Sequence, residues 1–220
     1  MTAAPPKRPS DSLRDPEWTK ARLLEAARGE FSDKGLSGAR VNAIAAAAGV
    51  NKQLLYYYFG DKESLYTAVL QQAYEEIRIG EQELDLERLP PEDAMRTFIE
   101  FNFDYMVSHR YFVALLGDEN LHEARHVRDS VQLSGLHARL EQTIGGTLAR
   151  GRAAGVFVRD IEPVDLYITI ASLCFFHLSN RHTLSAIFGR DFTSDTEIAH
   201  RREHVVDLLM SFLKSAPASE

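Results

Sequence analysis

The stretch VNAIAAAAGVNKQLLYYYFGDKESL, residues 41–65, decides the fold of this chain. Its alanine-rich first half predicts a short helix that stops at Gly49, and Asn51 is a favourable N-cap residue for a second short helix. Gly60 is placed to end that second helix, and Asp61 is placed to cap the next one. Two short helices joined by a turn that contains glycine are typical of a helix-turn-helix.

The helical period divides the side chains of this stretch into an inner set and an outer set. Those placed to pack inward are Ile44, Ala45, Ala48 and Leu55. Those left on the surface of the second helix are Lys52, Gln53, Tyr56 and Tyr57. One cation, one amide and two phenols on a short helix suit the major groove of DNA, where phosphates and base edges both need donors. Lys62 adds a cation beside backbone N–H groups that can also hold a phosphate.

The rest of the chain also shows helical punctuation. We expect further helices near residues 16–34, 61–77, 92–109, 130–153, 163–188 and 196–214. The polar stretch GDENLHEARHVRDS, residues 117–130, is expected to precede or open the helix at 130–153. No run combines period-2 alternation with hairpin turns, so the predicted fold class is all-α.

Composition and charge set limits on the class of protein. The 220 residues are 45% hydrophobic and 26% charged, which is ordinary for a globular protein. A single cysteine, Cys174, excludes an internal disulfide. The first twenty residues lack an apolar signal segment and no apolar run is long enough to span a bilayer, so we expect a cytoplasmic protein that does not enter the membrane.

The charge is unevenly distributed along the chain. Residues 1–70 carry a formal charge of +2 and residues 71–220 carry −9. A mildly basic head on an acidic body indicates that a polyanion would meet the head. We therefore expect a disordered tail at residues 1–15, a helix-turn-helix domain at 16–65, and a helical effector-binding and dimerisation domain at 66–216.

The spacing of residues 44–65 resembles the pattern of the tetracycline-repressor (TetR) family of bacterial transcription factors. The matching positions are Ile44-Ala45, Ala48-Gly49-Val50-Asn51, Leu55-Tyr56, Tyr58-Phe59, Lys62-Glu63 and Leu65. The resemblance is strong over residues 20–70, and GRAAGVFVRDIEPVDL, residues 151–166, is similar to the connection that this family has before its last two helices. It implies a DNA-binding transcriptional regulator, most often a repressor, and no enzyme or cofactor.

The resemblance and the side-chain chemistry together assign roles in DNA binding. The base-reading candidates are Lys52, Gln53 and Tyr56. The phosphate-binding candidates are Arg40, Asn42, Asn51, Tyr57, Tyr58 and Lys62. Each tyrosine is also consistent with a packed amphipathic residue, most of all Tyr58, because it adjoins Phe59.

Three departures from the family pattern affect which DNA sequence is recognised. Leu54 replaces a commonly small or polar residue, and it can contact a thymine methyl or stay half exposed. Gln53 stands where the family often has glycine, and a glutamine amide reads adenine directly. Arg40 stands where threonine is common, so it can reach a phosphate but cannot cap the helix in the same way.

The segment HEARH, His122 to His126, matches the H-E-x-x-H pattern of zinc proteases. A catalytic zinc site also needs a third ligand and an open coordination position, and the surrounding sequence is polar on every side. The alternatives are a metal-binding protein or zinc enzyme that uses His122-Glu123-x-x-His126, a regulatory metal site with Glu119, and a polar segment at the rim of an effector pocket. We expect no catalytic residue and no bound metal.

Within the family, the resemblance implies a homodimer formed by the last two helices, here about 162–188 and 194–214, and an unidentified small-molecule effector. A two-fold dimer presents two recognition helices, so the DNA operator should be a near-palindrome. Polar groups among aromatic residues are typical of a small-molecule site. The effector-binding candidates are Asn102, Tyr105, His109, Phe112, Glu119, His122, His177, Asn180 and Arg181. Each is equally consistent with a structural role.

Overall fold

The computed structural model describes residues 15–128 and 130–216, except for the side chains of residues 131–138. The described residues form helices and connecting turns without any strand, so the predicted all-α fold is confirmed. They divide into two compact units. The first extends to Ala73 and also includes Ala114–Val127, and the second comprises Tyr74–Val113 and the chain from Arg128. Apart from Asp15, the predicted disordered tail lies outside the described residues.

The first unit is built from short helices that pack around one apolar centre. It contains α2 (Pro16–Gly38), α3 (Val41–Ala48), α4 (Lys52–Phe59) and the first part of α5 (Lys62–Glu83). Helix α3 packs against both α2 and α4. The apolar side chains that fill the centre are Leu23, Ala27, Phe31, Ile44, Ala45, Ala48, Leu55, Leu65 and Tyr66. Their burial holds α3 and α4 as a helix-turn-helix.

The predicted caps and breaks of this unit are confirmed. The Asn51 side chain accepts a hydrogen bond from the backbone N–H of Gln53 at 2.9 Å, and Asp61 accepts one from Ser64 at 2.7 Å. Gly49 ends α3 with a positive φ of 67°, which glycine adopts without strain. Gly35 interrupts α2 in the same way, with φ 65°.

The polar stretch at residues 117–130 precedes the helix that begins at Val131, which is one of the two predicted alternatives, but it is itself partly helical. Its first part ends helix α7 (Arg110–Leu121), and its last part forms the short helix α8 (Arg125–Arg128), so it does not open α9 (Val131–Ala153). The carboxylate of Asp118 accepts a hydrogen bond from the backbone N–H of Leu36 at 2.9 Å. Asp118 therefore joins this stretch to α2 within the first unit, a contact that the sequence pattern does not reveal.

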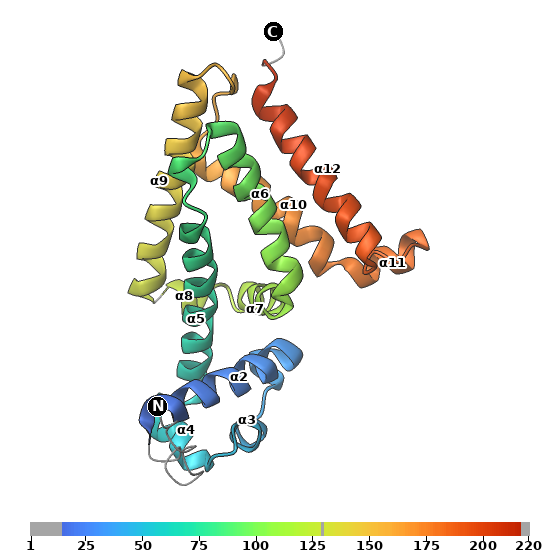
Figure 1. Cartoon of the computed structure of the whole chain (residues 1–220). Helices are drawn as coiled ribbons and strands as arrows, with labels where there is room; N and C mark the ends of the chain where they lie inside the picture. Colours follow the sequence, from blue (N-terminus) through green and yellow to red (C-terminus); the bar gives the residue numbers. More distant parts are fainter. Residues whose placement is uncertain (1–14, 129, 217–220) are drawn as a thin grey trace, which may run out of the picture. The chain divides into compact units, whose positions relative to one another are not determined.

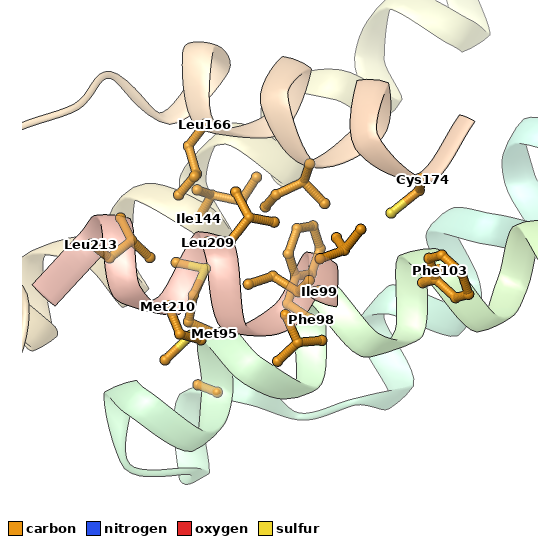
Figure 2. Close-up of a cluster of buried hydrophobic side chains, with 14 of the residues drawn as sticks. Met95, Phe98, Ile99, Phe103, Ile144, Leu166, Cys174, Leu209, Met210 and Leu213 are labelled. Atoms are coloured by element: carbon orange, nitrogen blue, oxygen red, sulfur yellow. The ribbon is translucent and has the colours of Figure 1, made fainter. Parts of the chain in front are cut away.

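The second unit is a bundle in which α6 (Pro91–Ser108) packs against α9, α10 (Pro163–Ser179) and α12 (Asp195–Lys214) (Figure 1). A 3-10 turn, η1 (Leu86–Arg88), connects α5 to α6. Figure 2 shows the apolar centre of this bundle, where Phe98 and Ile99 of α6 meet Leu209 of α12. Among the described residues, no helix is long and apolar enough to cross a membrane.

The long helix predicted over 163–188 is two helices in the structure. Helix α10 ends at Ser179, and α11 (Arg181–Phe188) follows it. The side-chain amide of Asn180 donates to the carbonyl of Phe176 at 3.0 Å, and its backbone N–H donates to the same carbonyl at 3.1 Å. Asparagine side chains compete in this way with helical hydrogen bonding, and the helix ends there.

Candidate functional site

Helix α4 presents a polar and aromatic surface because one apolar side chain anchors it. Leu55 is completely buried, whereas Tyr56 is 44% exposed and Tyr57 is 78% exposed. Lys52 and Gln53, at the start of the helix, are also exposed. The four side chains predicted on the surface of the second helix are therefore all accessible, and they offer a cation, an amide and two phenols to a ligand.

The charge around α4 favours a polyanion. From Lys34 to Gly60 the chain has three cations, Lys34, Arg40 and Lys52, and no Asp or Glu. Both α3 and α4 lie within this segment. A phosphate backbone that approaches α3 and α4 therefore meets the cations of this segment, and the segment has no carboxylates that would repel it.

The predicted phosphate-binding residues at the helix starts are accessible. Arg40 and Asn42 are exposed at the beginning of α3. The backbone N–H of Arg40 donates to Glu30 at 3.0 Å, which leaves the guanidinium unengaged by that bond. Asn51 uses its side-chain oxygen to cap α4 and keeps its amide N–H groups as donors.

Tyr58 and Lys62 are more engaged than the other candidates. Tyr58 is half-buried, its ring lies 5.0 Å from that of Tyr57, and the Lys20 ammonium lies 5.8 Å from its ring centroid. The Lys62 ammonium donates to the carbonyls of Leu36 at 2.7 Å and Ala39 at 3.3 Å. An ammonium has three donors, so two of these are committed to the end of α2.

One cation beside the turn was missed by the sequence reasoning. Arg22 is exposed on α2, lies over the ring of Trp18 at 4.9 Å, and approaches Gly49 so closely that a Cβ there would contact its guanidinium. A side chain at Gly49 would therefore disturb this cation as well as the turn. Arg22 lies one helical turn after Trp18 in α2, and this spacing is the sequence signal that points to Arg22.

The HEARH segment does not have the geometry of a zinc-binding helix. Its first histidine follows the last residue of α7, and its second lies in α8. Between them Glu123 and Ala124 have positive φ values of 57° and 54°. The two imidazoles therefore do not stand one turn apart on a continuous helix, as the protease motif requires.

His126 instead connects three segments of the first unit. Its Nδ1 lies 2.7 Å from a carboxylate oxygen of Glu119, and its Nε2 lies 2.7 Å from one of Glu63. The other oxygen of Glu119 accepts from the backbone N–H groups of His126 and Val127. His122 contacts the Asp118 carbonyl through Nδ1 at 2.8 Å. These are structural hydrogen bonds of a packed segment.

Cys174 has the surroundings of a structural residue. It is fully buried among the apolar side chains of the second unit (Figure 2). Burial raises the pKa of the Cys174 thiol to about 12, so it is protonated at neutral pH. A protonated thiol is a poor nucleophile.

The nine effector candidates do not converge on one site. Tyr105, His109 and Phe112 lie together in the second unit, where the Tyr105 ring stacks on that of His109 with centroids 3.9 Å apart. Glu119 and His122 belong to the first unit. The remaining four are buried or half-buried in the second unit: Asn102, His177, Asn180 and Arg181.

Cavities lie among the described residues of the second unit. One of about 330 Å³ has His177, Phe192, Arg201 and His204 among its lining residues, and His177 is the only one of the nine candidates that lines it. Another, of about 390 Å³, is lined by residues of α5, η1, α6 and α9, with Arg78 and Glu81 in its wall. Sequence reasoning missed this pair, because charged residues near the end of a helix usually face solvent.

The sequence of the chain matches known regulators in both units. Residues 23–69 match the sequence model of bacterial regulatory proteins of the tetR family, and residues 91–209 match that of the tetracyclin repressor-like C-terminal domain. The HTH-type transcriptional repressor NicS of Pseudomonas putida is 37% identical over 196 residues, which cover 89% of this chain and 92% of NicS. The repressor SCO4008 of Streptomyces coelicolor is 40% identical over 106 residues, 48% of this chain and 51% of SCO4008.

Solved structures show the same fold. A bacterial regulatory protein of the tetR family from Rhodococcus RHA1 superposes with a TM-score of 0.69 at 18% identity, covering 90% of this chain and 98% of that one. The transcriptional regulator SCO4942 of Streptomyces coelicolor gives a TM-score of 0.64 at 24% identity, covering 88% and 97%. Together with the exposed helix-turn-helix and the similarity to NicS over 89% of the chain, these matches show that the chain belongs to the TetR family and is a DNA-binding transcriptional regulator, not an enzyme.

Proposed function

We propose that this regulator is a homodimeric repressor that binds a near-palindromic operator through α4 and is released by a small molecule bound in its second unit. The observation that carries the proposal is the surface of α4, where Lys52, Gln53, Tyr56 and Tyr57 are exposed beside a segment without carboxylates. A short helix of this chemistry fits the major groove. Binding of an operator places the protein in the cytoplasm, where a bacterial chromosome lies.

Base reading and phosphate binding are assigned to different residues of the motif. Lys52 and Gln53 lie in the first turn of α4, where a recognition helix contacts base edges, and Tyr56 lies one turn further along. The phosphate contacts come from exposed side chains around it: Arg40, Asn42, Asn51, Tyr57 and Arg22, with Tyr58 and the remaining donor of Lys62. Gln53 gives the motif a direct means of selecting adenine.

Dimerisation through α10 and α12 is supported by the apolar side chains that these helices leave exposed. On α10, Ile168 is 54% and Phe176 is 58% exposed, and on α12, Leu208 is 47% exposed. Other apolar residues of the same helices, among them Leu166 and Leu209, are buried inside the unit. Each helix therefore has an inner apolar face and an outer one, and an exposed apolar patch of this kind marks a protein contact.

Release by an effector requires that it bind one conformer of the dimer more tightly than the other. An effector that favours a conformer with wrongly spaced recognition helices lowers operator affinity, with a coupling free energy of about 1–3 kcal/mol. The cavities of the second unit are the candidate sites for such a ligand.

Selection from a random duplex DNA pool by the purified protein, followed by sequencing, tests the proposal. We expect enrichment of a near-palindrome, and binding that weakens steeply between a low and a high salt concentration, because phosphate contacts release counterions. A dimeric protein that enriches no motif at either salt concentration would overturn the assignment of α4 as a recognition helix.

A further inference from the structure

Arg201 of α12 carries a charge that the described part of the chain does not compensate. It is half-buried, and a terminal nitrogen donates a long hydrogen bond of 3.5 Å to the carbonyl of Leu173. Among the described residues, its guanidinium forms no ion pair. Asp104, whose charge acts together with that of Arg201 on the Cys174 thiol, is held by Arg202 through hydrogen bonds of 2.7 Å and 2.8 Å. Because burial of a charge is costly without a counter-ion, Arg201 is equipped to hold an anion.

Arg201 lines the cavity of about 330 Å³ that lies where α10, α11 and α12 meet (Figure 1). The other ionisable residues of this wall are Arg190, Glu197, His177, His200 and His204. One terminal nitrogen of Arg190 donates to both carboxylate oxygens of Glu197, at 2.5 Å and 2.6 Å. With neutral imidazoles, two arginines and one glutamate give the wall a formal charge of +1. Since Arg190 and Glu197 neutralise each other, the surplus charge is that of Arg201.

The charge of Arg201 acts on the buried imidazole of the same wall. Burial lowers the pKa of His177, the charge of Arg201 lowers it further, and the carboxylate of Glu197 opposes both effects. His177 is therefore a neutral imidazole at neutral pH, although it stands near a carboxylate. An anion bound in this cavity would offset the repulsion between Arg201 and a protonated His177.

The remaining wall of the cavity is apolar. It consists of Phe176 of α10, Leu184 of α11 and Phe192 of the turn that follows α11. The Phe192 ring lies nearly perpendicular to the imidazole of His177, with ring centroids 5.7 Å apart. The volume is in the range of ligand pockets, and the exposed His204 places part of the wall in contact with solvent. An occupant therefore has a small apolar body and can enter from solvent.

The surplus charge of the wall selects the charged group of that occupant. One guanidinium calls for one negative charge, and its planar fork matches the two oxygens of a carboxylate. A cationic ligand would add a second uncompensated charge to the wall, and an uncharged one would leave Arg201 without a counter-ion. We propose that this cavity binds a monocarboxylate with a small apolar body, and that this ligand is the effector. The assignment names the ligand class of the second unit and therefore rests on the proposed function.

Calorimetric titration of the full chain at neutral pH tests the ligand class directly. The probes are benzoate and 3-phenylpropanoate, each compared with its uncharged amide, benzamide and 3-phenylpropanamide. Acetate supplies a carboxylate without an apolar body. We expect at least one of the two aromatic carboxylates to bind about tenfold or more tightly than its amide and than acetate, because a site built for a charged group rejects an analogue that lacks it. Equal affinity within each pair, or no measurable binding by either carboxylate, would overturn the inference.

Three variants locate the binding at this cavity. Arg201→Gln removes the surplus cation, Glu197→Gln removes the carboxylate of the wall, and Lys214→Gln removes a cation of α12 outside the cavity. We expect carboxylate affinity to fall about tenfold or more in Arg201→Gln, to rise about threefold or more in Glu197→Gln, and to be unchanged in Lys214→Gln. A misfolded protein does not gain affinity, so Glu197→Gln tests the wall even if Arg201→Gln fails to fold. Unchanged affinity in both wall variants would contradict the location.

The affinity for a carboxylate should also depend on pH. An anion that offsets the charge of Arg201 raises the pKa of His177, so the bound protein holds more protons than the free protein, and binding tightens as the pH falls. Protonation of His200 and His204 adds positive charge to the wall in the same direction. We expect the carboxylate that binds to do so about threefold or more tightly at about pH 6 than at about pH 8, and its amide to bind equally at both. An affinity that does not rise towards the lower pH would contradict the assignment of this wall.

The two proposals fail separately. Calorimetry reads carboxylate binding without DNA, and duplex selection reads operator binding without a ligand. A protein that enriches a palindrome but does not distinguish carboxylates from amides remains a repressor with another effector. A protein that binds the carboxylates but enriches no duplex retains the cavity assignment and loses the proposed function.

Discussion

At the scale of the residue, Gly35 shows how one backbone conformation connects two segments of the first unit. Its φ of 65° ends the main part of α2, and a Cβ at this position would collide with the carboxylate of Asp118. That carboxylate accepts the backbone N–H of Leu36. The glycine is therefore required both for its conformation and for the close approach of α7.

Replacement of Gly35 by alanine should lower the free energy of unfolding by about 1–3 kcal/mol, because it adds strain and displaces Asp118. Gly29→Ala is the matched control, since it lies in the same helix with open space around it. Alanine favours a helix, so we expect that control to be neutral or to stabilise by up to about 1 kcal/mol. Urea denaturation compares the two, and equal stabilities would contradict the assigned role of Gly35.

Lys52 and Lys62 are both cations of the helix-turn-helix, but the structure gives them different surroundings. Lys52 is exposed, whereas Lys62 holds two carbonyls at the end of α2. Lys62→Met should therefore lower the free energy of unfolding by about 1–2 kcal/mol through loss of charge-assisted hydrogen bonds. Lys52→Met should leave stability unchanged and weaken duplex binding. The opposite pattern in thermal unfolding and duplex titration would refute this division of roles.

At the scale of the element, the first turn of α5 is connected to α8 through Glu63. Its carboxylate accepts from His126 at 2.7 Å and from Arg125 at 2.9 Å. The hydrogen bond from His126 is the main cause that holds the pKa of Glu63 below its ordinary value, with Arg125 adding to it. A carboxyl whose pKa is lowered by folding stabilises the protein above its unfolded pKa and loses that contribution as the pH falls through its folded pKa.

Glu63→Gln should therefore destabilise the protein at neutral pH, by about 0.5 kcal/mol because the side chain is half-exposed and screened by solvent. The difference from the unsubstituted protein should shrink as the pH falls below about 4.3, where the unfolded carboxyl becomes protonated. Urea denaturation across this pH range measures it. A difference that stays constant down to the lowest pH would show that the charge of Glu63 contributes nothing.

The elements could be predicted from the sequence where they depend on local signals. Gly49, Asn51 and Gly60 punctuate α3 and α4 through their own backbone and side-chain chemistry, so their positions follow from residue type. The hydrogen bond between Asp118 of α7 and the backbone N–H of Leu36 joins positions 82 apart in the sequence, which no local pattern contains. The break at Asn180 does have a local cause, but the apolar run around it hides that cause.

The candidate sites also differ in whether local sequence signals predict them. The exposed surface of α4 follows from helical periodicity around Leu55, and it was predictable. Arg78 and Glu81 lie in the sequence EEIRIGEQE, residues 75–83, which has the composition of a solvated helix end. Their burial depends on how Tyr167 and α6 pack around α5, so only the folded chain reveals a polar cavity there.

At the scale of the whole molecule, the exposed apolar faces of α10 and α12 define the expected dimer. Ile168→Lys together with Leu208→Glu should convert the dimer to a monomer, because it places charges in an apolar contact. Ile79→Lys is the matched control, since Ile79 is 55% exposed on α5, against 54% for Ile168 on α10. Sedimentation equilibrium measures both. A double variant that remains dimeric would exclude this interface.

DNA reading by α4 is tested by the binding of the selected duplex to the protein and to the double variant Lys52→Ala, Tyr57→Ala. Both side chains are exposed, so the variant should unfold at the same temperature as the unsubstituted protein. We expect two protomers per full operator in sedimentation velocity, and an affinity that falls at least about tenfold in the variant through loss of roughly 1.4 kcal/mol or more. Unchanged affinity in a folded variant, or a single protomer per palindrome, would contradict the claim that paired α4 helices read this DNA.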